Sequence, residues 1–396
     1  MDELSLAVLA LILAVLLGLG IVERLLHERN LRTFSIRVHV NGTRGKSSVT
    51  RLIAAGLRAG GVRTCAKTTG TLPRLIHPDG VEEPIYRVGR PNVIEQVGVV
   101  RRARRLEAKA IVIECMALQP FLQWVSTSAL IRPTHGVVTN IRADHLDVMG
   151  PDEHGVGAAL AGSVPFSAPT YTSEHRYLDE LSEACAARHS ELIVVGEADE
   201  GVTDDELEAF RYIEHRENVA LALRVCRDLG IARRTALAGM QAARPDPGAL
   251  TVEKRMSFGR RLCFVNGFAA NDPESTGQVW EIALGRNQEF TRKVALVNCR
   301  VDRPERSVQL GEACVRWTPA DHYVVTGTGT TFFVHAAERA GLARSRLQVL
   351  EGARAPALAE SLAGLADPEG LVVGLGNIGG VGLELMDFLR SQERFV

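Results

Sequence analysis

The 396-residue sequence has few of the residues that mark several protein classes. Its seven cysteines show no CxxC or metal-finger spacing, which argues against a disulfide framework or a zinc site. Lys and Arg number 46 against 47 for Asp and Glu, so the chain lacks the positive field that non-specific nucleic-acid binding requires. No nucleic-acid partner is therefore expected. The hydrophobic share of 46% is instead typical of a chain with at least two buried cores.

The first segment is a long run without a charged residue, from Leu4 to Val22. A helix of this length spans about 29 Å, close to the thickness of a bilayer's hydrocarbon core. A cleaved secretory signal is one alternative, but Asp2 and Glu3 precede the run where basic residues would be expected. A buried core helix is another, but such helices seldom lack a polar face. Because arginines follow the run at positions 24, 29, 32 and 37, we expect a single-pass anchor of the cell membrane over 1–23, with the remaining chain on the cytoplasmic side.

A glycine-rich turn lies between a strand pattern and a helix pattern. Residues 35–40 alternate polar and β-branched side chains, and residues 49–59 are apolar at helical spacing. In such a turn, backbone N–H groups and the helix N-terminus bind phosphates, a lysine reaches the β- and γ-phosphates, and the next hydroxyl holds Mg²⁺. Although Val40 stands where the full P-loop pattern has glycine, we expect an ATP site. It comprises Asn41, Gly42, Thr43, Arg44, Gly45, Lys46, Ser47 and Ser48.

Three further segments place polar residues after predicted strands. A hydroxyl-rich loop runs from Thr68 to Thr71, Glu114 ends a buried strand at 110–113, and His145 follows a strand at 136–141. Because ligands bind at the carboxyl edge of an open α/β sheet, we expect Glu114 to be a Mg²⁺ ligand. Alternatives stay open at each place. They are an ordinary polar turn at 68–71, a structural carboxylate at 114 and a surface histidine at 145.

The rest of the chain predicts two α/β domains. The turn-forming cluster from Arg244 to Gly248 is interpreted as a linker, which gives a central domain at 35–244 and a smaller one at 249–396. In the central domain, Asn92 and Glu95 resemble the cap of a helix, and residues 151–210 show only one strand pattern, at 192–195. The second domain alternates helical patterns with five strands, which predicts a parallel sheet. The strands are 262–265, 294–297, 322–326, 348–350 and 371–373.

A second glycine-rich run, Gly374 to Gly382, follows the last of these strands. It contains G-x-G-x-x-G, but a dinucleotide site requires that its strand open a βαβ unit, and here the chain ends. We expect a tight turn close to a ligand or partner, or turn geometry alone.

These motifs occur in the order found in the Mur ligase family, which includes the muramyl-peptide amino-acid ligases and the folylpolyglutamate synthases. The chain resembles that family from about residue 35 onward, and most of all its poly-γ-glutamate synthases of the PgsB or CapB type. The resemblance implies an α/β fold with a Mur-ligase-like P-loop ATPase domain and a smaller Rossmann-like C-terminal domain. The segments that carry it are 38–48, 68–71, 111–120 and 139–150.

The resemblance extends the candidate site. Asn218 matches a residue that contacts adenine, Arg300 and Arg303 match positions that face the nucleotide, and Asn271 and Asp272 lie in a loop assigned to substrate. Catalytic roles fall to Lys46 and His145, and the bound ion would be Mg²⁺ or Mn²⁺. The full set of expected metal ligands is Ser47, Thr71, Glu114 and His145.

Three features depart from the family pattern. The domain that holds a uridine nucleotide in muramyl ligases is missing, which disfavours a cell-wall precursor as substrate. Asn266 stands where the family has an aspartate. No lysine occurs between 151 and 250, so the carbamylated lysine of many Mur ligases has no counterpart. The chain's only lysines are Lys46, Lys67, Lys109, Lys254 and Lys293.

The implied activity is ADP-forming amide synthesis that builds poly-γ-glutamate. A carboxylate is a poor electrophile because oxide is a poor leaving group, and phosphorylation by ATP supplies a better one. The implied partners are glutamate, the growing poly-γ-glutamate chain, an integral membrane subunit of the PgsC/CapC type and further copies of this chain. Two alternatives are a folylpolyglutamate-type ligase and a membrane-tethered P-loop ATPase that drives a partner.

Overall fold

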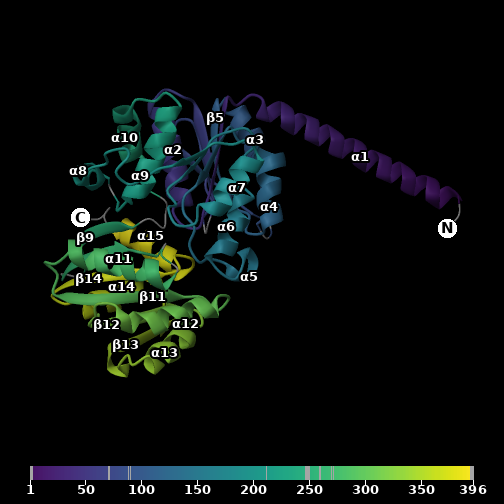
Figure 1. The fold of residues 1–396 in the computed structure, drawn as a ribbon. Coiled ribbons are helices and arrows are strands. Elements are labelled where there is room, and N and C mark those ends of the chain that lie inside the picture. Colours follow the sequence, from purple (N-terminus) through teal and green to yellow (C-terminus); the bar gives the residue numbers. More distant parts are fainter. Residues whose placement is uncertain are drawn as a thin grey trace. The chain divides into compact units, whose positions relative to one another are not determined.

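The computed structural model describes residues 3–69, 72–87, 89, 91–210, 212–245, 250–257, 260–268, 270 and 272–392. The chain forms two compact units, Met1–Phe210 with Glu214–Arg244, and Arg211–Ile213 with Pro245–Val396 (Figure 1). The first is called unit 1 and the second unit 2. Two predicted site residues, Thr71 and Asn271, lie outside the described residues.

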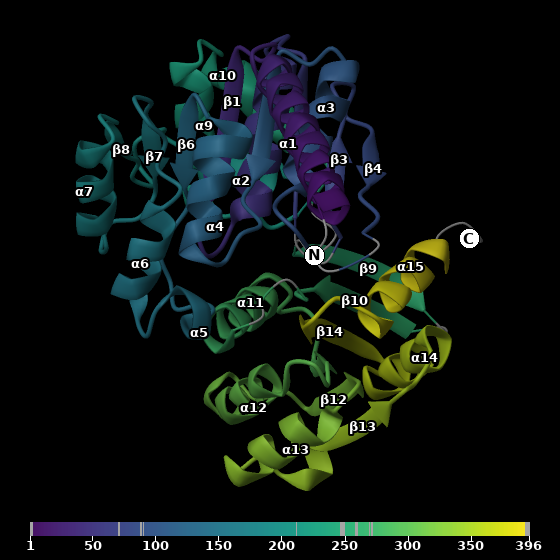
Figure 2. The ribbon, with the colours of Figure 1, turned by 90° about the vertical axis from the view of Figure 1, so that its right-hand side faces the viewer.

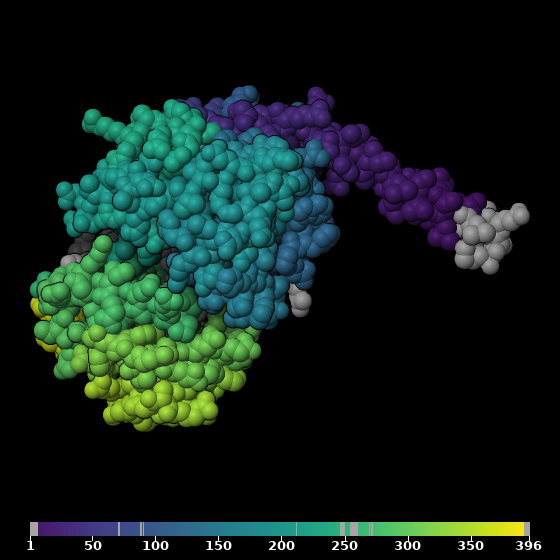
Figure 3. All heavy atoms as spheres, in the orientation of Figure 1, coloured from purple at the N-terminus to yellow at the C-terminus, as the bar shows by residue number. Residues whose placement is uncertain are grey.

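Helix α1, Glu3–Leu31, projects from unit 1 (Figures 1 and 3). Its side chains from residue 7 to residue 26 are exposed, and Ala7–Leu31 is long and apolar enough to cross a membrane. The helix therefore continues past the predicted anchor of 1–23. Only its last turns are buried: His27 Nε2 donates to Leu130 O at 2.8 Å, and Arg104 Nη1 donates to Asn30 Oδ1 at 2.7 Å.

Unit 1 is built on one sheet with the strand order β4-β3-β2-β5-β1-β6-β7-β8. The six strands from β2 to β8 in this order run parallel, whereas β3 and β4 are antiparallel additions at one edge. The strands are β1 Ile36–Asn41, β2 Thr64–Lys67, β3 Arg74–Ile76, β4 Glu82–Pro84, β5 Ala110–Glu114, β6 His135–Val138, β7 Thr170–Thr172 and β8 Leu192–Val194.

Helices cover both faces of this sheet, as Figures 1 and 2 show. One face is covered by α2, α9 and α10, which pack on one another, and the other by α3, α4 and the π-helical turn η1 that continues α4. The helices are α2 Lys46–Ala59, α3 Glu95–Arg105, α4 Pro120–Val125, η1 Ser126–Ile131, α5 Leu146–Met149, α6 Glu153–Ala161, α7 Asp179–Ala187, α8 Asp204–Glu208, α9 Arg216–Asp228 and α10 Arg233–Ala242.

Two local predictions for unit 1 differ from the structure. Residues 151–210, for which one strand was expected, also contain α6, β7, α7 and α8; these elements are too short to show a hydrophobic period. The prediction that Asn92 and Glu95 together cap a helix is wrong, because the residue before α3 is Ile94 and no side chain caps it. Asn92 does accept a bond there, from the N–H of Ile94.

Unit 2 has a sheet with the strand order β13-β12-β11-β14-β10-β9. The predicted parallel sheet is confirmed for the five strands β10 to β14, but β9 is an antiparallel edge strand that no prediction included. Its sequence, TVEKRMS, lacks the apolar run that identified the others. The strands are β9 Thr251–Ser257, β10 Arg260–Asn266, β11 Arg292–Cys299, β12 His322–Gly327, β13 Leu347–Glu351 and β14 Glu369–Gly376.

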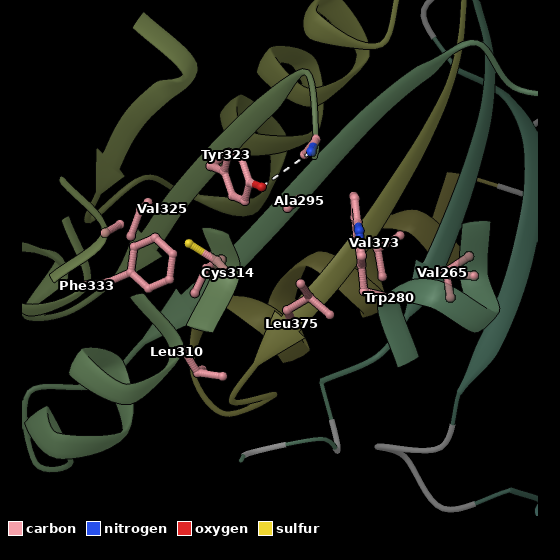
Figure 4. Packing of buried hydrophobic residues seen from close by; sticks show 14 of the residues in the cluster. Val265, Trp280, Ala295, Leu310, Cys314, Tyr323, Val325, Phe333, Val373 and Leu375 are labelled. Carbon is pink, nitrogen blue, oxygen red and sulfur yellow. Dashed lines mark hydrogen bonds between the residues drawn. The ribbon is translucent and has the colours of Figure 1, made fainter. Parts of the chain in front are cut away.

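Two apolar cores lie on the two faces of this sheet. Because strand side chains alternate, Ala295 and Val297 face the core under α11 to α13, and Val294 and Leu296 face the core under α14 and α15. Figure 4 shows the first core, with Trp280 against Val373 and Leu375. The helices are α11 Pro273–Arg286, α12 Pro304–Ala313, η2 Cys314–Arg316, α13 Thr330–Arg339, η3 Arg344–Arg346, α14 Ala355–Leu365 and α15 Val381–Gln392.

Candidate nucleotide and metal site

The turn between β1 and α2 requires glycine at two positions. Gly42 and Gly45 have φ values of 128° and 78°. A Cβ atom would lie 2.1 Å from Thr139 Oγ1 at Gly42, and 2.6 Å from Asn218 Oδ1 at Gly45. Gly45 is the last residue before α2, whose first N–H groups have no partner inside the helix. A close turn that ends at the start of a helix is a suitable site for phosphate.

The turn is held in shape by residues that follow β6. Asn140 Oδ1 accepts from Thr43 Oγ1 at 2.8 Å and from the N–H of Arg44 at 3.0 Å, and Thr139 Oγ1 donates to Arg44 O at 2.5 Å. No role was predicted for Thr139 or Asn140, although both lie in segment 139–150, one of the four that carry the family resemblance. Their function here is to fix the turn's backbone.

The ammonium group of Lys46 lies on its own turn. Nζ donates to Gly42 O at 2.6 Å and to Thr43 O at 3.0 Å. Desolvation lowers the pKa of Lys46, and the negative charges of Glu114 and Asp144 oppose that shift. A cation is therefore held beside the glycine backbone, within electrostatic reach of two carboxylates.

Glu114 connects three of the predicted segments. Its side chain is 3% exposed, and Oε2 accepts from Ser47 Oγ at 2.9 Å and from the N–H of Thr69 at 2.6 Å. Hydroxyl and carboxylate oxygens suit Mg²⁺, which binds one or two carboxylates and completes its shell with water and substrate phosphates. In the described part of the chain, no group of three or more His, Cys, Asp or Glu side chains could hold a metal. Ser47 and Glu114 thus fit as two ligands of a Mg²⁺ ion whose other ligands are water and the phosphates of a nucleotide.

Asp144 lies close to two other residues of the predicted site. Arg44 Nη1 lies 3.4 Å from Asp144 Oδ2, and His145 Nε2 lies 3.9 Å from Asp144 Oδ1. His145 has a positive φ of 47° and immediately precedes α5. Within the described residues, it belongs to no group of three or more His, Cys, Asp or Glu side chains that could hold a metal.

The remaining predicted residues of unit 1 differ in their surroundings. Asn218, near the start of α9, is buried against the turn at Gly45 and donates from Nδ2 to Glu214 Oε1 at 2.8 Å. Asn41 is also buried, and its amide donates to Gln123 Oε1 on α4 at 2.7 Å. Ser48 is half-buried in the first turn of α2.

A second lysine near the site was missed by the sequence analysis. Lys67 is fully buried at the end of β2, with Nζ 3.0 Å from Glu95 Oε1, and Glu95 also pairs with Arg87 at 2.6 Å. Desolvation lowers the pKa of Lys67, and Glu95 and, more weakly, Glu114 oppose this. Lys67 precedes the hydroxyl-rich loop in a chain with only five lysines, and that scarcity was the available signal.

In unit 2, the predicted arginines lie at the carboxyl end of β11. Arg300 forms a two-bond pair with Asp302, at 2.9 and 2.6 Å, and both Arg300 and Arg303 line a small pocket with Asn298 and Asn377. Asp272 caps α11, because its Oδ1 accepts from the N–H of Ser275 at 2.9 Å. The structure thus gives Asp272 a local structural role.

Family comparisons match both units. A model described as "Mur ligase middle domain" matches residues 40–161, and one described as "Poly-gamma-glutamate synthase CapB C-terminal domain" matches residues 252–392. The chain is 35% identical to the capsule biosynthesis protein CapB of Bacillus anthracis over 94% of this chain and 80% of that protein. It is 34% identical to the PGA synthase CapB of Bacillus subtilis (strain 168) over 96% of each chain.

Solved structures share the fold. The chain is similar to a bifunctional folylpolyglutamate synthase/dihydrofolate synthase of Yersinia pestis, solved with AMPPNP and Mn ion, with a TM-score of 0.69 and 15% identity over 92% of this chain and 91% of that one. The folylpolyglutamate synthase of Mycobacterium tuberculosis, solved with ADP and AMPPCP, gives a TM-score of 0.64 and 19% identity over 90% and 91% of the two chains. At these identities the likeness establishes the fold alone.

Proposed function

The chain belongs to the CapB poly-γ-glutamate synthases of the Mur ligase family, and from this membership we propose that it is an ATP-dependent, ADP-forming amide ligase that joins glutamate units into poly-γ-glutamate. The observation that carries the proposal is the set formed by the glycine turn, Lys46, Ser47 and Glu114. This set combines a phosphate cradle, a cation and a pair of oxygen ligands at one edge of the sheet.

The chemistry follows from what these groups can do. An oxygen of the γ-carboxylate of glutamate, or of the growing chain, attacks the γ-phosphorus of ATP, and the bond from that phosphorus to the β–γ bridging oxygen breaks to release ADP. An amine nitrogen then attacks the acyl carbon, phosphate leaves with the electron pair of the acyl C–O bond, and the amine loses its proton. Positioning and charge stabilisation dominate such transfers, so no covalent nucleophile is required.

Each residue of the set has a defined task. The turn's N–H groups and the start of α2 bind phosphate oxygens, and Lys46 neutralises negative charge on the γ-phosphate. Ser47 and Glu114 would hold a divalent ion, Mg²⁺ or Mn²⁺. When bound, that ion supplies positive charge at the phosphates. Thr71 and His145 as further ligands, Asn218 at the adenine, and Arg300 and Arg303 at the nucleotide belong to the same proposal.

We also propose that α1 anchors the chain in the cell membrane once, with both units on the cytoplasmic side. The uncovered apolar length of α1 and the arginines that follow residue 22 support this. A growing polymer that is made at a membrane needs a route onward, so an integral membrane subunit of the PgsC/CapC type is the proposed partner, together with further copies of this chain.

Product analysis tests the activity. Purified full-length chain, with and without membrane partners, is incubated with ATP, Mg²⁺ and L- or D-glutamate, and the nucleotide and any γ-linked polymer are identified. We expect ADP release that glutamate stimulates, together with γ-glutamyl product. AMP would indicate adenylation, activity only with folate would indicate the folylpolyglutamate-type ligase, and hydrolysis that glutamate does not change would indicate an ATPase that drives a partner.

A further inference from the structure

Helix α4 exposes large apolar side chains although it begins only six residues after Glu114. Phe121 is 67% exposed, Trp124 is 43% exposed, and the neighbouring Leu118 is also exposed. The two rings form a stacked pair with centroids 6.0 Å apart and planes 28° apart. Isolated apolar side chains on a surface are ordinary, but an ordered aromatic pair on one helix indicates a contact surface.

The opposite side of α4 is tied to the phosphate turn. Gln123 is fully buried, accepts from Asn41 Nδ2 at 2.7 Å and donates to Leu118 O at 2.9 Å. The aromatic face therefore belongs to a helix whose inner side supports the start of the glycine turn. A ligand of that face would therefore contact a helix that also supports the candidate nucleotide site.

The helical run that carries the aromatic face reaches the root of α1, defined as its last turns at residues 23–31. The run from α4 through η1 ends at Ile131; just before this end Leu130 O accepts from His27, and just after it Arg132 pairs with Glu28 at 3.2 Å. His27 lies about 8 Å along the helix from Val22, the end of the expected span, and a headgroup layer is about 5–7 Å thick. Figure 2 shows α1 projecting from the side of unit 1 that α3 and α4 cover. This side thus lies next to the surface of any membrane that α1 crosses.

Charges around the root of α1 complement anionic lipid. Glu23 and Glu28 are the acidic residues at the root, and Glu28 is paired with arginines. Exposed arginines outnumber them, and aromatic rings beside basic side chains are typical of segments that lie in the interface of an anionic membrane. These arginines are Arg24, Arg29, Arg32, Arg101, Arg105 and Arg132.

We propose that the face formed by Leu118, Phe121 and Trp124 inserts into the headgroup layer of the membrane that α1 crosses, with anionic phospholipid as its contact. The inference rests on the proposed anchor. It adds a second attachment point that holds the catalytic edge of unit 1 close to the bilayer surface, where a polymer destined for a membrane subunit has to be delivered.

Tryptophan fluorescence tests the contact in the full-length chain. The chain has three tryptophans, of which Trp280 and Trp317 lie in unit 2. The protein is placed in nanodiscs of phosphatidylcholine and phosphatidylglycerol, with and without bromine on the acyl chains close to the headgroups. We expect bromine to quench the emission of Trp124 in the wild type. This loss of emission should be absent in Trp124→Phe. Equal quenching in the two chains would overturn the proposal.

Matched substitutions define the face. Phe121→Ser should weaken the quenching of Trp124, while Phe332→Ser, at an exposed aromatic of α13 in unit 2, should leave it unchanged. Both positions are exposed, so thermal unfolding in detergent should stay at the wild-type temperature.

A chain that does not enter the disc would contradict both anchor and contact, whereas entry without quenching contradicts the contact alone. Shielding of Trp124 only when a second membrane protein is present would show that the face binds protein instead. The measurement needs no ATP, so its result is independent of the ligase activity.

Discussion

Each of the two units has a glycine-rich turn at the end of a buried parallel strand, and a different side chain binds to the backbone of each turn. In unit 1, the turn after β1 leads directly into α2 and carries the ammonium of Lys46. In unit 2, the turn after β14 surrounds the side chain of Asn298, whose amide donates to Asn377 O and to Gly379 O. Both turns contain glycines with positive φ, among them Gly376 and Gly380.

The difference shows that a glycine pattern predicts a turn but not a ligand. The unit 1 turn offers N–H groups and a cation, which suit an anion, and the neighbouring Ser47 and Glu114 add oxygen atoms of the kind that Mg²⁺ prefers. The unit 2 turn directs carbonyl groups inward, and an amide of the protein already satisfies them. Asn298 thus gives the turn from Gly374 to Gly382 a structural support, while Gly376 and Asn377 also line the small pocket with Arg300 and Arg303, so both predictions for this turn stay open.

The largest expected effect is the loss of turnover when the charged group of the unit 1 turn, the ammonium of Lys46, is removed. Lys46→Ala should reduce turnover by about 10²- to 10³-fold, the typical loss when one group that stabilises transition-state charge is removed. The exposed Lys109, at the start of β5, gives a matched control, Lys109→Ala, that should keep wild-type turnover. Steady-state ADP release with glutamate measures both. Near-normal ATP use by Lys46→Ala would remove the turn from the mechanism.

Backbone shape gives the next comparison. Gly42→Ala places a Cβ atom 2.1 Å from Thr139 Oγ1, so nucleotide binding should be lost. Gly380→Ala meets nothing within 4 Å, although its φ of 68° remains unfavourable for alanine. It should cost about 1–2 kcal/mol of unfolding free energy and leave nucleotide binding intact. Titration with a fluorescent ATP analogue distinguishes them, and equal binding by the two variants would break the comparison.

The proposed metal ligand, Glu114, has a smaller expected effect. Glu114→Gln keeps the shape of the side chain and removes its charge, so the Mg²⁺ concentration for half-maximal activity should rise about 10-fold or more, in line with 1.5–3 kcal/mol for an interaction with a charged group. Glu83→Gln, on the edge strand β4, is the control and should leave the requirement unchanged. An unchanged Mg²⁺ requirement in Glu114→Gln would exclude this carboxylate as a ligand.

The contribution of the Asn298 side chain to the unit 2 turn can be tested through the free energy of unfolding. Asn298→Ala leaves the carbonyls of Asn377 and Gly379 without their donor, which should lower the unfolding free energy by about 1–3 kcal/mol. Gln348→Ala, on the edge strand β13, removes a bond to Ser361 and should cost less. Urea unfolding followed by circular dichroism measures both. An Asn298→Ala chain as stable as the wild type would show that this amide does not hold the turn.

The smallest expected effect compares the units by their thiols. All seven cysteines are buried, and burial raises the pKa of Cys65, Cys226 and Cys314 from 9.0 to about 12. Because the neutral thiol is favoured in the folded chain, the stability that this gives is complete below pH 9.0 and is lost as the pH rises toward about 12. Thiol labelling should therefore be slow in the native chain at neutral pH. Rapid labelling in one unit only would show that this unit opens separately.

The elements that carry the turn could be predicted because they are contiguous in the sequence. The strand, the glycines and the helix between residues 35 and 59 each have their own local pattern, and the structure confirms them as β1 and α2. The five parallel strands of unit 2 were predictable for the same reason. Strand β9 was not, because its three consecutive charged residues, at 253–255, do not distinguish an edge strand from a loop.

The contacts that shape the site could not be predicted in this way. Asn140 meets Thr43 across 97 positions, and Lys67 meets Glu95 across a segment that contains β3 and β4, so no local pattern records either pair. Glu95 was assigned to a helix cap because a cap is the nearest partner in sequence, whereas a buried ammonium is the partner in space. To predict long-range pairs of this kind, one must know the strand order of the sheet, which brings β2, β5, β1 and β6 side by side.

The most direct test of the account follows one oxygen atom. Glutamate labelled with ¹⁸O in its γ-carboxylate is incubated with the full-length chain, ATP and Mg²⁺ under conditions in which polymer forms. If the γ-phosphate is transferred to that carboxylate before the amide bond forms, one ¹⁸O atom must appear in the released inorganic phosphate. Label found in AMP, or phosphate released without label while polymer accumulates, would contradict the account.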